Sequence, residues 1–239
     1  MKKFFTNKYT LIVLGVIVLF LLWFLVSLIV KNPIIFPDPF LTIKTLFEML
    51  GDAYIYKCLG SSFLRLIIGF IIGGFLGFIF GIIFSYFKKG VHVFKPTLIA
   101  IKAIPTAAII FLFVALAGYE NAPVLIVALV TFPILYESTL AGLSNIPNEY
   151  KDELKLSSSN FLHSLIEVKL FFASSYILVG LLTSFALAFK IEIMSEIIAG
   201  NTTYGIGVAI KTATQLDAGN MVPVFAYSLF VILLILLIN

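Results

Sequence analysis

Long apolar runs, interrupted by single charges or short polar stretches, dominate the hydrophobic pattern of this chain. Six runs contain no Asp, Glu, Lys or Arg: Tyr9 to Val30, Leu66 to Phe87, Ala103 to Tyr119, Asn121 to Tyr136, Leu170 to Phe189 and Ala218 to Asn239. An α-helix needs about 20 mostly apolar residues to cross roughly 30 Å of hydrocarbon. The pattern therefore predicts an all-α integral membrane protein with six transmembrane helices and no separate soluble domain.

The first apolar run is longer than the roughly 7–15 residues of a signal-peptide core, and no small-residue cleavage site follows it. We therefore expect a retained signal anchor. The sequence NPIIFPDPF comes next, and its three prolines predict an extended connection, with a short helix over Thr42 to Leu50 at the outer surface. This divides the chain into residues 1–54, the anchor span and outer segment, and residues 55–239, the main transmembrane domain.

Composition and charge fit a membrane protein. Only 12% of the residues are charged, against about 25% in soluble proteins. With the N-terminus in the cytoplasm, the short inner loops carry more lysines than the outer ones, as the positive-inside rule requires. The expected location is the cell membrane, with multiple passes and a cytoplasmic N-terminus. The net charge of +4 is explained by this topology and needs no nucleic acid partner.

The sequence argues against catalysis. Cys58 is the single cysteine, and His92 and His163 are far apart, so no metal site is expected. There is no Walker-type phosphate loop, nucleophile elbow or zinc-binding His pair. We expect neither a cofactor nor enzymatic activity, and if the protein performs transport, the energy has to come from elsewhere.

Glycines recur every four residues in the second apolar run. Gly69, Gly73, Gly77 and Gly81 fall on one helix face, where another backbone can approach closely. Packing within the chain's own bundle is the favoured interpretation, and a subunit interface or sliding surface is the alternative.

Polar residues near the outer membrane face are candidates for a translocation pathway. Ionisable groups at membrane depth usually face protein or a water-filled cavity. Glu192 and Glu196 share a helix face, with Lys190 close by, and Glu196 is the strongest candidate. The uncharged candidates are Ser61, Ser62, Thr183 and Ser184.

The most polar stretch, KDELKLSSSN at residues 151–160, is expected on the cytoplasmic side. The Ser-Ser-Asn sequence breaks a run of helix formers. Phe161, Leu165 and Val168 then recur at helical spacing. We expect two short amphipathic helices, whose apolar stripe seats either in a cytoplasmic partner or against the ends of the bundle.

This segment resembles the cytoplasmic coupling loop of permeases from binding-protein-dependent ABC importers, in the nitrate, sulfonate, taurine and bicarbonate branch. In the family's Glu-Ala-Ala motif, Asp152 takes the Glu position, Glu153 and Leu154 the two Ala positions, and Ser158 that of the later glycine, while Phe171 replaces a proline. The flanking sequences NPIIFPDPFLTIKTL, SSFLRLIIGFIIGGFLGFIFGI, FKPTLIAIKAIPTAAI, FPILYESTLAGLSNIPNE and SEIIAGNTTYGIG are similar to the branch in the same order.

The resemblance implies a type-1 importer permease fold with a coupling-helix loop at residues 55–239. It also implies ATP-driven uptake of a small solute. Its implied partners are cytoplasmic ABC ATPase subunits, an extracytoplasmic solute-binding protein, a second permease subunit in a homo- or heterodimer, and membrane lipid. ATPase coupling is assigned by resemblance to Lys151, Asp152, Glu153, Leu154, Ser158, Phe161, Leu165 and Val168. The alternatives are a non-transporting membrane scaffold descended from such a permease, and a secondary carrier.

Overall fold

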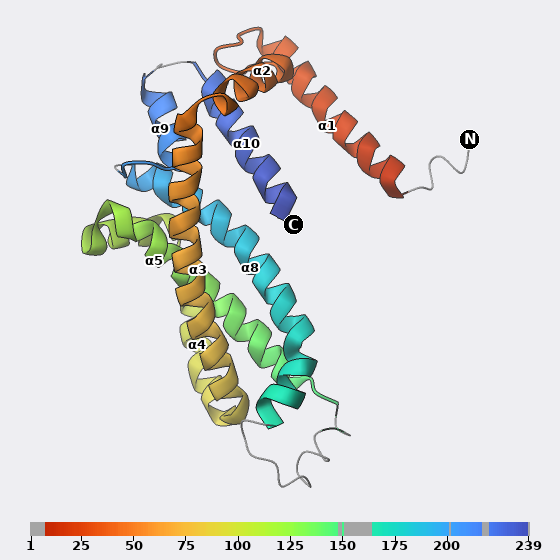
Figure 1. The fold of residues 1–239 in the computed structure, drawn as a ribbon, viewed down its shortest axis with the longest axis vertical. Helices are drawn as coiled ribbons and strands as arrows, with labels where there is room; N and C mark the ends of the chain where they lie inside the picture. The colour runs from red at the N-terminus through yellow and green to blue at the C-terminus, as the bar shows by residue number, and fades with distance from the viewer. Residues whose placement is uncertain (1–7, 148–149, 151–163, 201, 217–219, 239) are drawn as a thin grey trace.

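The structure is a computed structural model that describes residues 8–147, 150, 164–200, 202–216 and 220–238. The described residues are helical or irregular, and Figure 1 shows how the helices are arranged. The helices, in chain order, are α1 (Lys8–Val30), α2 (Pro39–Leu50), α3 (Ala53–Tyr86), α4 (Lys88–Ala103), α5 (Thr106–Ser144), the π-helix η1 (Ser164–Lys169), α8 (Leu170–Ala199), α9 (Ile206–Leu216) and α10 (Val222–Ile238).

The all-helical membrane prediction is confirmed. Four helices within the described residues are long and apolar enough to cross a membrane: Thr10–Val30, Ala53–Tyr86, Thr106–Ser144 and Leu170–Ala199, and a shorter apolar helix covers Val222–Leu237. The third and fourth predicted spans both fall in α5. Its two halves are separated by Gly118, whose φ of 78° and ψ of 171° break the helix. Only glycine adopts such a conformation without steric cost.

Helix α4 was not expected, because the sequence between the second and third apolar runs is rich in lysine. It begins directly after α3 and ends at Ala103, where Ile104 is extended (ψ 131°). Pro105 explains this break, since the residue before a proline is pushed out of the helical region. The chain re-enters a helix at Thr106.

The N-terminal part of the chain lies beside the last helix rather than within the central bundle (Figure 1). Asp38 starts α2 by accepting a hydrogen bond from the Leu41 backbone at 2.9 Å, which confirms the predicted short helix. The indole of Trp23 on α1 donates to the carbonyl of Pro37 at 3.1 Å and contacts Phe225 of α10. Most of the α1 side chains are exposed in the single chain.

The central bundle consists of α3, α5 and α8, and α3 meets α5 along the face that carries the four spaced glycines. A methyl group built on Gly69 would lie 2.5 Å from the Val124 carbonyl oxygen, and one on Gly77 would lie 2.5 Å from that of Phe132. Gly73 approaches the Ala128 backbone still more closely, and Gly81 faces Thr139. The structure therefore places this face inside the chain's own bundle, against the backbone of α5.

We predict that Gly73→Leu separates α3 from α5. A leucine side chain would have to displace the α5 backbone, which should cost at least the roughly 1–3 kcal/mol typical of overpacking. Gly60→Leu, on the same helix, is the matched control, because nothing lies within 4 Å of a methyl group at Gly60. Thermal unfolding in detergent should show a clear loss for Gly73→Leu alone, and equal behaviour of both variants would contradict the close contact.

Candidate functional site

A buried carboxylate joins α8 to two other elements of the fold. Glu196, in the last turn of α8, is fully buried. Its carboxylate accepts hydrogen bonds from the Ser62 hydroxyl at 2.8 Å, the Arg65 guanidinium at 2.7 Å and the Gly207 backbone at 2.9 Å. Buried charges are tolerated when they are paired and hydrogen-bonded. Glu196 meets both conditions, with partners on α3 and α9.

Arg65 extends this contact to α5. Its second guanidinium nitrogen lies 2.6 Å from a carboxylate oxygen of Glu120, and its first also donates to the carbonyl of Tyr204 at 2.8 Å. Glu120 in turn accepts a hydrogen bond from the Thr203 backbone at 2.9 Å. The side chain of Arg65 is 11% exposed and that of Glu120 is 52% exposed. The cluster therefore runs from the buried interior at Glu196 to the surface of the subunit at Glu120.

Glycines allow α9 to begin beside Glu196. A methyl group on Gly205 would lie 2.5 Å from the Glu196 carboxylate carbon, and one on Gly207 would lie 2.7 Å from the Glu196 β-carbon. The Gly207 backbone N–H belongs to the first turn of α9, where helical N–H groups have no partner within their own helix. Glu196 satisfies this group, and its negative charge suits the positive end of the helix.

Glu192 lies one helical turn before Glu196 and is also fully buried. Within the described parts of the chain, neither of its carboxyl oxygens has a hydrogen-bond partner. Both glutamates that were expected on a polar helix face therefore point into protein, while Lys190 is exposed.

Of the five predicted pathway residues, the structure brings together Ser62 and Glu196. Ser184 is buried and bonds to the Leu181 carbonyl of its own helix, and Thr183 is exposed and bonds to the carbonyls of Val179 and Gly180. Ser61 is partly buried.

The pathway prediction omitted Arg65 and Glu120. Arg65 could have been identified, since it is the one arginine among 16 basic residues and lies at helical spacing from Ser62 and Gly69. Arginine is the preferred residue for buried, bidentate ion pairs. Glu120 gave no comparable sequence signal, because its role depends on how α5 bends at Gly118.

The predicted coupling segment is described only at its C-terminal end. Lys151, Asp152, Glu153, Leu154, Ser158 and Phe161 lie outside the described residues. Leu165 in η1 is 7% exposed and packs with Leu143 of α5 and Ala173 of α8, and Val168 is partly buried. Of the two alternatives for the apolar stripe, Leu165 takes the contact with the bundle itself, so its side chain is not free to dock on a partner.

A hollow of about 330 Å³ lies between α4, α5 and α8, apart from the Arg65 cluster. Its wall is mostly aliphatic and includes Ile109, Ile126, Leu129, Ile134, Leu187 and Ile191. Lys102, near the end of α4, also lines it and pairs with Glu137 of α5.

We predict that removal of Arg65 destabilises the bundle far more than removal of a surface charge. Arg65→Leu leaves the buried Glu196 carboxylate without its cation, which should cost about 3–5 kcal/mol. Lys44→Ala breaks the exposed Lys44–Glu48 pair (3.8 Å) and should cost about 0–1 kcal/mol. The double variant Arg65→Leu/Glu196→Leu should recover part of the loss. Similar thermal unfolding temperatures for Arg65→Leu and Lys44→Ala would show that Glu196 tolerates the loss of its cation.

Comparisons with known proteins agree with this architecture. The sequence profile of the family described as binding-protein-dependent transport system inner membrane component matches residues 69–239. A protein of Bacillus subtilis (strain 168) that carries the name aliphatic sulfonates transport permease protein SsuC is 24% identical over 194 residues, covering 81% of this chain and 70% of that protein. A chain from an inward-facing structure of the MetNI methionine ABC transporter superimposes with a TM-score of 0.60 at 13% identity, covering 77% of this chain and 92% of that one.

The structural likeness shows the fold, that of a type-1 importer permease, and the profile match covers most of the chain. The family is a transport component, in which ATP hydrolysis belongs to a separate subunit, and it implies ATPase and substrate-binding partners. The chain thus belongs to the inner membrane components of binding-protein-dependent transport systems, and it is a multi-pass membrane permease subunit of an ABC importer.

Proposed function

We propose that this permease imports a small solute of the sulfonate, nitrate, taurine or vitamin-precursor kind. In this proposal an extracytoplasmic solute-binding protein delivers the solute, two permease subunits share the pathway, and a pair of cytoplasmic ATPase subunits drives transport. The observation that carries the proposal is the match of the family profile to residues 69–239. The similarity to a protein named as an aliphatic sulfonates permease supports the solute class.

The assignment of regions follows from this function. Residues 1–54 form the anchor span and outer segment, and residues 55–239 form the permease domain, with the N-terminus in the cytoplasm. The excess of lysine in the predicted inner loops supports this orientation. A cysteine introduced at Thr6 should react with a membrane-impermeant maleimide in inside-out vesicles only. Cys58 is fully buried and should not interfere.

The Arg65 cluster is proposed to close one end of the pathway. It links α3, α5, α8 and the start of α9 through side chains that come from distant parts of the sequence. Ionisable groups at membrane depth usually line or close such pathways. Its exposed edge at Glu120 suits contact with water at a pathway mouth.

Uptake into proteoliposomes tests the transport function. We predict that the permease, assembled with its ATPase and binding protein, accumulates radiolabelled taurine or butanesulfonate only when ATP is supplied on the ATPase side. Uptake driven by an ion gradient without ATP would instead identify a secondary carrier. Absence of uptake for a panel of small sulfonates, nitrate and vitamin precursors, with no stimulation of ATP hydrolysis, would favour a non-transporting scaffold.

In this proposal, the residues that precede η1 make the contact with the ATPase subunit. We predict that Phe161→Asp abolishes both solute-stimulated ATP hydrolysis and co-purification of the ATPase, because a charge in an apolar contact is strongly unfavourable. The amount of permease in the membrane should stay normal.

Leu165→Asp is the matched comparison. Leu165 is buried within the chain, so this substitution should lower the yield and thermal stability of the permease itself. The coupling proposal fails if Phe161→Asp retains full ATPase binding and uptake.

A further inference from the structure

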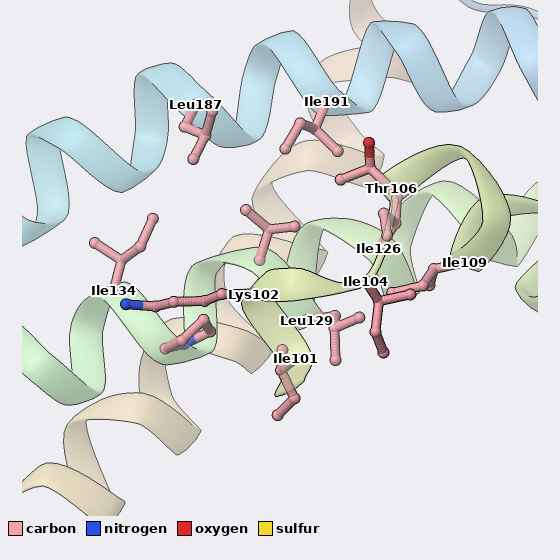
Figure 2. Close-up of a pocket in the computed structure, with 12 residues that line it drawn as sticks. Ile101, Lys102, Ile104, Thr106, Ile109, Ile126, Leu129, Ile134, Leu187 and Ile191 are labelled. Carbon is pink, nitrogen blue, oxygen red and sulfur yellow. The ribbon is translucent and has the colours of Figure 1, made fainter. Parts of the chain in front are cut away.

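The hollow between α4, α5 and α8 has the size and lining of a small-molecule site. Its volume of about 330 Å³ lies within the range of roughly 300–1,000 Å³ that is usual for ligand pockets, and such pockets are mostly apolar with a few placed polar groups. At roughly 30 Å³ for each water-sized group, it has room for about ten non-hydrogen atoms. Figure 2 shows Leu187 and Ile191 of α8 facing Ile104, Ile126 and Leu129 across it.

Among the described residues that line this hollow, Lys102 is the one with a charged side chain, and its charge is paired with a carboxylate. Figure 2 shows its side chain extended toward Ile134 of α5. Its amino group makes an ion pair with Glu137, one turn further along α5. The two side chains are 41% and 51% exposed in the single chain, so the pair lies at the surface of the subunit rather than being sealed in the bundle. Once water or a solute reaches such a pair, it can exchange partners at little cost, because ion pairs exposed to water contribute little stability.

We propose that this hollow binds a small zwitterionic solute, with its aliphatic body on the Ile and Leu wall and its adjacent opposite charges on Lys102 and Glu137. The proposal rests on the proposed transport function and places a solute station within this permease subunit. The solute's acid group replaces Glu137 as the partner of Lys102. Its ammonium group takes the place of Lys102 at Glu137, so every charge keeps an opposite partner.

The paired charges argue for a zwitterion over a simple anion or cation. An anion bound to Lys102 would lie beside the carboxylate that it displaced, and like charges at such short range repel. A primary amine bound to Glu137 would likewise lie beside the Lys102 ammonium that it displaced, and these two positive charges would repel each other. A lipid acyl chain would fill the apolar wall but would make no use of the charge pair at the edge.

Protection of an introduced cysteine locates binding at this site. Thr106 lines the hollow and is partly buried, so Thr106→Cys should react slowly but measurably with a small maleimide, while Cys58 is fully buried. The assembled transporter is labelled in the presence of norleucine, hexanoate or hexylamine, which share a six-carbon chain and differ in charge. At about four times its Kd, norleucine leaves roughly one fifth of the sites free and should slow labelling about fivefold. Hexanoate and hexylamine at the same concentration should leave the labelling rate unchanged.

Charge variants in the Thr106→Cys background test the role of the pair. Lys102→Gln and Glu137→Gln should each remove the protection by norleucine, and the exchanged pair Lys102→Glu/Glu137→Lys should restore it. Lys44→Gln, which alters a distant exposed pair, is the matched control and should keep full protection.

The outcomes that would overturn the inference are distinct. Equal protection by hexanoate would show an anion site, and protection that survives Lys102→Gln would show an apolar contact alone. A cysteine that stays unreactive in the assembled transporter, but reacts in the isolated subunit, would show that another subunit covers the hollow. ATP-driven uptake by the unaltered transporter separates these results from a failure of the proposed function, because uptake can proceed without this station.

Discussion

The backbone contact between α3 and α5 is the constraint on which the rest of the bundle depends. Lipid tails are as apolar as the side chains, so helices in a membrane associate through close packing rather than through the hydrophobic effect. Gly69, Gly73 and Gly77 let α5 approach until backbone atoms face one another. The same principle continues on the other side of α5, where Gly142 meets Ala173 of α8 and Gly180 meets Ser138. If one helix shifted along its neighbour at any of these contacts, a larger side chain would replace the glycine and clash with the neighbouring helix.

This fixed alignment positions the charges. Arg65 lies one turn before Gly69 on α3, so the helix pairing that seats the glycines also sets the distance from Arg65 to Glu120 and Glu196. A buried ion pair contributes little net stability, since desolvation offsets the attraction, but an unpaired member costs a great deal. The cluster therefore disfavours other arrangements of α3, α5, α8 and α9. If one of these helices were displaced, at least one charged side chain of the cluster would lose its partner.

At the opposite end of the bundle, the proposed coupling segment is joined to two of the bundle helices. The π-helix at Ser164–Lys169 continues directly into α8, and Leu165 packs between the end of α5 and the start of α8. Under the proposed function, this covalent continuity and this buried contact are the route by which the preceding residues would move both helices. The same two helices form one wall each of the hollow beside Lys102.

The sequence by itself determined the class of protein. Apolar runs of spanning length predicted a helical membrane protein, and the resemblance of the polar segment and its flanking motifs to a known family implied an importer permease. The short helix α2 was predicted after the proline-rich connection. These features are local, because length, period and turn chemistry act within a few residues. Helix α4 escaped prediction because its lysine-rich start obscured the helical pattern.

Only the tertiary structure decided which polar residues act together. Ser62 and Glu196 were predicted as pathway residues, whereas Arg65 and Glu120 were not. In the structure, Ser62 and Arg65 both donate hydrogen bonds to Glu196, which lies 134 and 131 residues further along the chain. Lys102 and Glu137, 35 residues apart, meet because α5 turns at Gly118 and returns along α4. Such pairings depend on the bend angles and packing distances of whole helices, and no short stretch of sequence encodes these. The physical reason is that the sequence gives the chemical type of each side chain directly. The distances between side chains on different helices depend instead on the backbone contacts that the glycines allow.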